Sequence, residues 1–325
     1  MAEQAIILIG LGASYNRGGD SALAMQHIET GLALARQVKD IRIEIMALSD
    51  LAQITSEQGD YDTAKQYLDK VLLLARTCND RAHIALALAT MGTIAWRWGD
   101  IEQADECLRE SLATYKELGD QHRIPRILNG LGILAILREQ YDQAEAYWEE
   151  ALAMVQEMQD LQAMADTLTN LGYINHHNLG NLEKAKKYYQ KSLSIAQEIG
   201  HRHGVTSTLS NLGHLYVLMG EHAPAWDYLR QALSESLVIG TAPLTLDALA
   251  GVAQLRAETE QRDSAAELLG VILNHPSVQL DSVQVAETVL ATLRDVLPAE
   301  QLTAAIERGK TMKLDAVVAE LLAKE

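Results

Sequence analysis

The stretch from Asn170 to Gly200, NLGYINHHNLGNLEKAKKYYQKSLSIAQEIG, holds two apolar segments separated by a turn at Gly180-Asn181. The Leu171-Gly172 pair and Ala185 recur upstream, with such a turn, at a spacing of about 40 residues. Within each segment the apolar residues follow the period of an amphipathic helix. We therefore predict that every repeat is a pair of antiparallel helices joined by a tight turn.

Four columns of residues define the repeat. The leucine column of the first helix contains Leu8, Leu48, Leu88, Leu128, Leu168 and Leu209. The small-residue column that follows it contains Gly12, Ala52, Gly92, Gly132, Gly172 and Gly213. The second helix has a small-residue column at Ala24, Ala64, Ala104, Ala144, Ala185 and Ala225 and a leucine column at Leu32, Leu72, Leu112, Leu152, Leu193 and Leu233. Small residues at fixed positions indicate that the two helices pack closely.

The columns divide the chain into a repeat region and a C-terminal cap. Six hairpins are predicted over residues 1–240, with the approximate bounds 1–40, 41–80, 81–120, 121–160, 161–201 and 202–241. Residues 242–325 are expected to form a degenerate seventh hairpin and capping helices. The last two helices are expected to start at Pro298 and near Leu314, and Gly309 is expected to be a helix C-cap.

These residues resemble the tetratricopeptide repeat (TPR), whose pattern has Leu-Gly in the first helix, Gly-Asp at the turn and Ala followed by Ala-Leu in the second helix. The resemblance implies an all-α fold, a right-handed superhelical solenoid of antiparallel helix hairpins with a helical C-terminal cap. The period of about 40 residues exceeds the usual 34, which is typical of the long repeats in kinesin light chains and in maltose-activator-like regulators.

The C-terminal sequence LPAEQLTAAIERGKTMKLDAVVAELL resembles the end of bacterial signal-transduction ATPases with numerous domains (STAND), which include LuxR-type transcription regulators. The resemblance implies that this chain is the sensor or scaffold region of such a multidomain regulator, with a nucleotide-binding domain upstream. We therefore expect an excised fragment whose first hairpin exposes Ile6, Ile7 and Ile9.

The composition disfavours several classes of partner. The chain has 44 acidic and 27 basic residues and a formal net charge of -17. This charge argues against direct binding of nucleic acid or of an anionic membrane, because both need clustered Lys and Arg. The sequence has no signal peptide and no apolar run near the ~20 residues of a membrane span, which favours a cytoplasmic protein. Cys78 and Cys107 are expected to be reduced thiols.

No motif of the sequence predicts a catalytic or metal-binding site. The histidines of the fifth and sixth repeats lack the spacing of a metal site, and no HExxH or paired CxxC motif occurs. No Ser-His-Asp, Cys-His or paired-carboxylate arrangement stands out from a helical surface rich in acidic residues. We expect no enzymatic activity, no cofactor and no metal.

The TPR resemblance places a concave ligand groove on the first helix of each hairpin. The candidate groove residues are Asp50, Gln53, Glu57, Thr93, Trp96, Arg97, Arg126, Asn129, Asn170, Tyr173, His176, His177, Asn211 and His214. Asn170 and Asn211 occupy the position from which TPR asparagines bind the backbone of an extended peptide, and an amide offers both donor and acceptor. The alternative is that these two asparagines only solvate the inner face.

The leading functional hypothesis is therefore a module that binds a peptide or protein partner in the groove. Two alternatives stay open. One is a sensor of a small-molecule inducer, which would need a deep pocket with stacking aromatics such as Tyr173 and Trp96. The other is a self-associating scaffold, that is, a homo-oligomer.

Overall fold

The computed structural model of this chain describes residues 1–323. These residues form helices joined by short turns, and no strand occurs among them. In chain order the helices are α1 (Ala2–Arg17), α2 (Ser21–Val38), α3 (Ile41–Glu57), α4 (Tyr61–Thr77), α5 (Arg81–Arg97), α6 (Ile101–Leu118), α7 (Ile124–Leu137), α8 (Tyr141–Glu157), α9 (Leu161–His177), α10 (Leu182–Glu198), α11 (Arg202–Leu218), α12 (His222–Ile239), α13 (Ala242–Glu258), α14 (Arg262–Asn274), α15 (Leu280–Val296), α16 (Ala299–Lys310) and α17 (Leu314–Ala323). The predicted all-α fold is confirmed.

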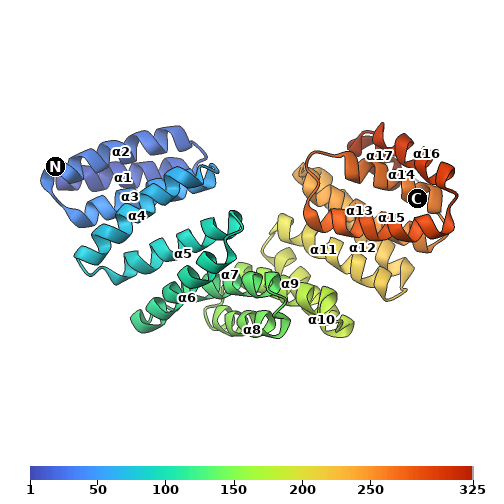
Figure 1. The fold of residues 1–325 in the computed structure, drawn as a ribbon, viewed down its shortest axis with the longest axis horizontal. Helices are drawn as coiled ribbons and strands as arrows, with labels where there is room; N and C mark the ends of the chain where they lie inside the picture. The colour runs from blue at the N-terminus through green and yellow to red at the C-terminus, as the bar shows by residue number, and fades with distance from the viewer. Residues whose placement is uncertain (324–325) are drawn as a thin grey trace. The chain divides into compact units, whose positions relative to one another are not determined.

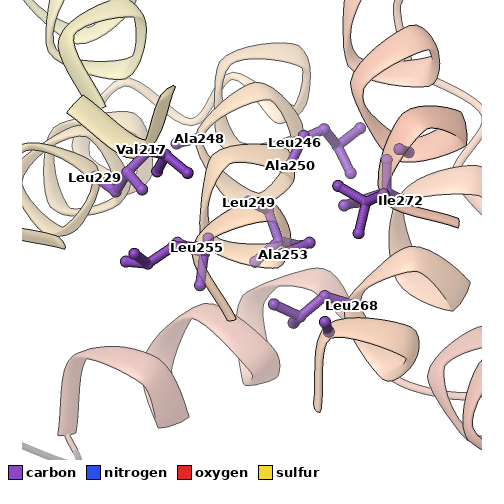
Figure 2. Packing of buried hydrophobic residues seen from close by; sticks show 14 of the residues in the cluster. Val217, Leu229, Leu246, Ala248, Leu249, Ala250, Ala253, Leu255, Leu268 and Ile272 are labelled. Carbon is purple, nitrogen blue, oxygen red and sulfur yellow. The ribbon is translucent and has the colours of Figure 1, made fainter. Parts of the chain in front are cut away.

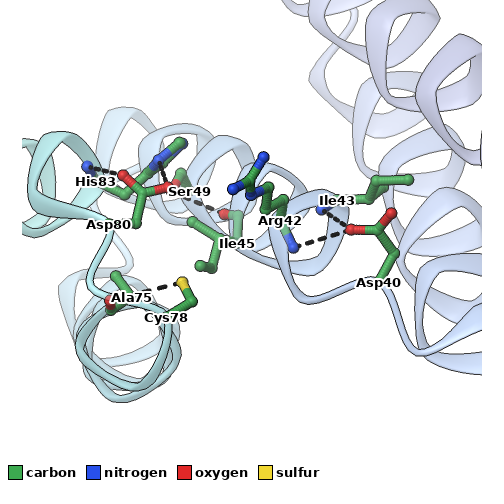
Figure 3. A network of polar contacts seen from close by, with 9 residues as sticks. All are labelled: Asp40, Arg42, Ile43, Ile45, Ser49, Ala75, Cys78, Asp80 and His83. Carbon is green, nitrogen blue, oxygen red and sulfur yellow. Dashed lines mark hydrogen bonds and ion pairs between the residues drawn. The ribbon is translucent and has the colours of Figure 1, made fainter.

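Aspartates at the turns begin many of these helices. The Asp40 carboxylate accepts hydrogen bonds from the backbone N–H groups of Arg42 at 3.1 Å and Ile43 at 3.3 Å, and Asp80 caps α5 in the same way (Figure 3). Other helices are capped in this way by Asp20, Asp60, Asp100 and Asp160. Each cap satisfies a backbone donor that the helix leaves unpaired, which is worth about 1 kcal/mol. The turn motif therefore fixes where each helix starts.

The chain packs as two compact units, Met1–Met154 and Val155–Glu325, of which residues up to 323 are described. In unit 1 the helices pack as the pairs α1–α2, α3–α4 and α5–α6, followed by α7 and most of α8 (Figure 1). In unit 2 the pairs are α9–α10, α11–α12 and α13–α14, followed by α15 to α17. The predicted domain boundary near residue 240, between repeats and cap, stays a prediction.

The core of unit 1 shows why the small-residue columns exist. A Cβ atom added to Gly132 would lie 2.6 Å from the ring of Trp148, a side chain that is 2% exposed. In α1, Ile9 packs in the same manner against Gly31 and is buried. The prediction that Ile9 is exposed was wrong for that reason, whereas Ile6 and Ile7 are exposed as expected.

The core of unit 2 surrounds α13. Leu246, Leu249 and Ala253 are fully buried, and the side chains of Leu268 and Ile272 from α14 belong to the same cluster (Figure 2). Every turn of α13 is buried because neighbouring helices cover it on several sides.

Helices α14 and α16 cross at two glycines. A Cβ atom on Gly309 would collide with the backbone carbonyl of Glu267, and one on Gly270 would collide with the carbonyl of Ile306. Helix α16 continues to Lys310, with Thr311 as its C-cap and Pro298 as its N-cap. The prediction that Gly309 is a C-cap was therefore wrong, because its lack of a side chain serves this crossing. Pro298 likewise precedes the helix instead of being its first residue.

Candidate functional site

Unit 1 contains a recess of about 530 Å³ between the first helices of its hairpins, which we call the unit 1 recess. It is lined by Gln53, Ser56, Glu57, Leu86, Ala89, Thr90, Gly92, Thr93, Trp96, Arg97, Leu108, Tyr115, His122, Arg123, Arg126, Ile127, Asn129, Gly130, Ile133 and Leu134. All the candidate residues expected in this part of the groove line it except Asp50.

An irregular helix start shapes this recess. Helices α3, α5 and α9 begin directly after a capping aspartate, whereas Asp120 is followed by a turn over residues 121–123 before α7 begins at Ile124. Pro125 lies in the first turn of α7, where its missing N–H is tolerated. His122 and Arg123 consequently stand in a turn at the edge of the recess.

The unit 1 recess carries positive charge. Arg97, Arg123 and Arg126 line it, and Glu57 is its only carboxylate among the described residues. Glu57 accepts hydrogen bonds from the amides of Asn16 at 3.0 Å and Gln53 at 2.9 Å, so it does not pair with the arginines. The local charge is thus opposite in sign to that of the whole chain.

Two further groups of this recess have defined surroundings. Asn129 accepts a hydrogen bond from Trp148 Nε1 at 3.0 Å, which fixes the indole against Gly132. Tyr115 is 1% exposed, and its hydroxyl makes no hydrogen bond within residues 1–323. Burial raises the pKa of Tyr115, and the nearby charge of Arg123, whose guanidinium lies 5.8 Å from the ring centroid, opposes that rise.

Unit 2 contains a second recess, of about 430 Å³, between α9, α11, α13 and α15. This unit 2 recess is lined by Thr169, Asn170, Tyr173, His177, Ser207, Asn211, His214, Pro243, Leu244, Asp247, Gln279, Asp281, Ser282, Gln284, Val285 and Thr288. Asn170 and Asn211 therefore line one space, together with three other predicted residues, Tyr173, His177 and His214. Among the described residues, no Lys or Arg lines it.

The polar groups of the unit 2 recess are held in place by their neighbours. His214 contacts Gln254 Oε1 through Nδ1 at 3.2 Å and the Asp247 carbonyl through Nε2 at 3.1 Å. The Ser210 hydroxyl donates to the Asp247 carboxylate at 2.6 Å. The rings of Tyr173 and His177 lie 4.4 Å apart, centroid to centroid. These contacts give the recess an aromatic side and an acidic side.

The acidic side affects nearby titrating groups. Burial, followed by the charges of Asp281 and Asp247, raises the pKa of Tyr173 to about 12. The pKa of the Asp281 carboxyl is also raised, first by burial and then by the charge of Asp247. The recess therefore favours neutral or cationic groups over anionic ones.

Two predicted groove residues lie outside both recesses. His176 is 4% exposed, its two ring nitrogens have no hydrogen-bond partner in the described chain, and burial, with the charges of His177 and His214, lowers its pKa to about 2. Asp50 is half-buried on α3, and burial, opposed by the charge of His83, raises its pKa to about 6. Whether any of the predicted residues binds a ligand stays a prediction.

The sequence analysis missed several lining residues. Gln279, Asp281, Ser282, Gln284, Val285 and Thr288 lie on or just before α15, which has no column in the repeat pattern. His122, Arg123 and Tyr115 were missed because they lie outside the regular first helices. Pro125, which interrupts the start of a first helix, was the available signal for the irregular recess.

The described residues contain no group of three or more His, Cys, Asp and Glu side chains arranged to hold a metal ion. Within residues 1–323, every helix is too short or too polar to cross a membrane. Cys78 is exposed, Cys107 is buried, and neither forms a disulfide.

Comparison with solved structures finds the same fold in proteins of low sequence identity. A STAND protein with a TPR sensor, PH0952 from Pyrococcus horikoshii, matches 98% of this chain and 44% of its own at 14% identity, with a TM-score of 0.69. Aspartyl phosphate phosphatase F from Bacillus subtilis matches 89% of this chain and 76% of its own at 15% identity and a TM-score of 0.65. BtubC from P. vanneervenii matches 66% and 91% at 21% identity and a TM-score of 0.59.

Sequence comparison identifies the family. No curated protein matches the sequence. The family model of the tetratricopeptide repeat matches residues 43–117, 84–157 and 163–234, together more than half of the chain. The chain therefore belongs to the tetratricopeptide repeat family.

Proposed function

We propose that this chain is a protein-binding module that takes up an extended polypeptide segment of a partner on the inner faces of its first helices. Tetratricopeptide repeats generally mediate protein–protein interaction. The observation that carries the proposal is that Asn170 on α9 and Asn211 on α11, one repeat apart, line the same recess. Side-chain amides at that spacing suit the alternating donors and acceptors of a peptide backbone.

The lining of the unit 2 recess supports a second candidate, recognition of a small polar molecule. Tyr173 lines the same space as Asn170, Asn211 and Asp247. Helix α15, which follows the repeats, also lines this space. A recess of about 430 Å³ lies in the range of small-ligand pockets. Trp96 belongs to the other recess, so it does not contribute to this pocket.

The wider role that we propose is the sensor or scaffold region of a cytoplasmic bacterial signalling or transcription regulator. The fold match to a STAND protein with a TPR sensor, over 98% of this chain, supports this context. In such a regulator a nucleotide-binding domain precedes the repeats. Immunoprecipitation from the source cells followed by mass spectrometry tests this role. Peptides from an upstream nucleotide-binding domain are expected in the same polypeptide. A cellular protein of only these 325 residues would contradict the proposal.

Peptide binding is tested by selecting a random-peptide display library on the purified chain and titrating the selected peptides. The double variant Asn170→Ala/Asn211→Ala should lower the affinity for peptides that bind the unit 2 recess by about thirtyfold, because two hydrogen bonds are lost at about 1 kcal/mol each. The matched control is Gln197→Ala/Gln231→Ala, which removes two exposed amides from α10 and α12. Peptides that bind the double variant as tightly as the wild type would refute the role of the asparagines, and a library that yields no binder would refute the module.

A further inference from the structure

We infer that the unit 1 recess binds an acidic segment of a protein partner, in which a carboxylate side chain lies beside a large apolar side chain. This inference rests on the proposed protein-binding function and specifies the chemistry of the ligand at a second recess.

The charges of the recess point to an anionic ligand. Three guanidinium groups face one carboxylate there, in a chain with 44 acidic and only 27 basic residues. Arg126 is exposed and has no ion-pair partner among residues 1–323. Arg97 contacts the neutral Tyr61 hydroxyl at 3.0 Å instead of a carboxylate. Only Arg123 forms an ion pair, with Asp120 at 3.4 Å, and its side chain is 51% exposed. Two cationic groups thus remain without a counter-charge.

The floor of the recess is apolar. Gly92 and Gly130 stand on either side of Leu108, and a Cβ atom on them would lie 2.8 Å and 2.9 Å from that side chain. Trp96, half-buried, and Ile133 line the same space. An aromatic side chain beside arginines accommodates a large apolar group together with an anion. The ligand therefore needs both kinds of side chain.

The Tyr115 hydroxyl is the second, independent indication of a ligand. It is buried, lines the recess beside the Arg123 guanidinium, and its O–H has no hydrogen-bond acceptor in the described chain. A buried hydroxyl without a partner costs free energy, which an acceptor on a ligand would recover. A carboxylate oxygen that reaches the arginines is such an acceptor.

A polypeptide segment fits these features better than other polyanions. Nucleic acids and anionic membranes need basic groups spread over a wide surface, and the net charge of -17 repels them. The basic groups here converge on one recess of about 530 Å³, which holds a few side chains. A short acidic stretch of a protein matches that size and charge.

The test uses the full chain and the same random-peptide display library, with the selected peptides titrated by fluorescence anisotropy. We expect one class of selected peptides to be enriched in Asp or Glu next to Trp, Phe or Leu. Arg126→Glu should lower the affinity for this class of peptides at least about tenfold, and a higher ionic strength should lower the affinity of the wild type as well. The control Arg230→Glu makes the same charge change at an exposed position of α12 and should leave its affinity unchanged.

Tyr115→Phe supplies a second variant that does not threaten folding. It removes a buried hydroxyl that has no acceptor, so the protein should melt at about the same temperature, while the acidic peptides bind about fivefold more weakly. Selected peptides without acidic enrichment, or acidic peptides unaffected by Arg126→Glu, would overturn the inference. Peptides that depend on Asn170 and Asn211 alone would overturn it while leaving the proposed function standing.

Discussion

The recesses of unit 1 and unit 2 have similar volumes and opposite charge. In unit 1 the lining includes three arginines and a single carboxylate, whereas in unit 2 it includes Asp247 and Asp281 and, among the described residues, no Lys or Arg. Both recesses lie mainly on the first helices of hairpins that follow the same repeat pattern. The difference shows that the fold and the charge of the recess are encoded at different positions of the first helices.

The packing positions explain why this separation is possible. Gly132 and Gly172 occupy the same column, and each lies against an aromatic ring of the following helix, Trp148 or Tyr189. Arg126 and Asp166 occupy equivalent places of successive repeats, six residues before these glycines, and both are exposed, so they can differ in charge without changing this packing. The charge at this position can therefore vary while the glycine column stays the same.

The largest effect on this comparison is expected from Gly309→Ala. The added methyl group collides with the carbonyl of Glu267 at the crossing of α14 and α16, so unit 2 should lose about 3 kcal/mol of unfolding free energy. Urea denaturation followed by circular dichroism measures the loss. Peptides of the unit 1 recess should bind as before, and an unchanged denaturation midpoint would show that the two helices do not need this close approach.

The next effect concerns unit 1. Asn129→Ala leaves the buried Trp148 indole N–H without its acceptor, which should cost about 2 kcal/mol. In a Trp148→Phe background the same substitution should cost far less, because the donor is already absent. Equal costs in both backgrounds would indicate that Asn129 does not stabilise the protein through the indole.

The pH dependence of stability should have opposite signs in the two units. In unit 2 the pKa of His176 falls from its ordinary 6.5 to about 2, so the unfolded chain binds the proton more readily and stability is lost as the pH falls below 6.5. His176 should contribute about 1.4 kcal/mol of this loss at pH 5.5. His177, whose pKa burial lowers to about 4, should add a similar amount, so His176→Leu should remove about half of the loss.

In unit 1 the pKa of Asp50 rises from 3.8 to about 6, so the folded chain binds the proton more readily and stability increases as the pH falls from 7 towards 5. The gain should stay below about 1 kcal/mol because the group is only half-buried, and Asp50→Asn should remove it. Urea denaturation of the two variants across this pH range measures both slopes, and slopes of the same sign would contradict the assignment.

The smallest effect is expected from Gly10→Ala. Gly10 is exposed inside α1, and a methyl group there meets no atom within 4 Å, so the substitution should stabilise unit 1 by about 0.5 to 1 kcal/mol. A thermal melt provides the measurement. A loss of stability would mean that the solvent-facing side of α1 is not free, and it would undo the contrast with Gly309.

The helix hairpins could be predicted because they depend on the local helical period. Most of the candidate groove residues line one of the two recesses, and their binding of a ligand stays a prediction. Asn170 and Asn211 could be placed from their distance to the leucine column alone. His176 was predicted to face the groove, but its side chain is buried. It lies one residue before His177, and one residue along a helix turns the side chain by about 100°, here into the core. Helix register must therefore be known to within one position.

Features that depend on contacts between distant segments could not be predicted. The role of Gly309 requires α14 and α16 to cross, and the lining by Asp281 requires α15 to stand beside α13. Neither pairing follows a repeat column. Arg97 and Arg126 were predicted in the groove, but the third arginine of the unit 1 recess was not, because Arg123 is brought to it by the turn before Pro125.

The central claim, that the inner faces of the first helices bind polypeptide, is tested most directly by photo-crosslinking. A display-selected peptide carrying a photoreactive group is irradiated with the full chain, and the crosslinked residues are mapped by mass spectrometry. The account predicts crosslinks to α3, α5 and α7 for acidic peptides and to α9, α11, α13 and α15 for the others. Crosslinks confined to the second helices, such as α4, α10 and α12, would contradict it.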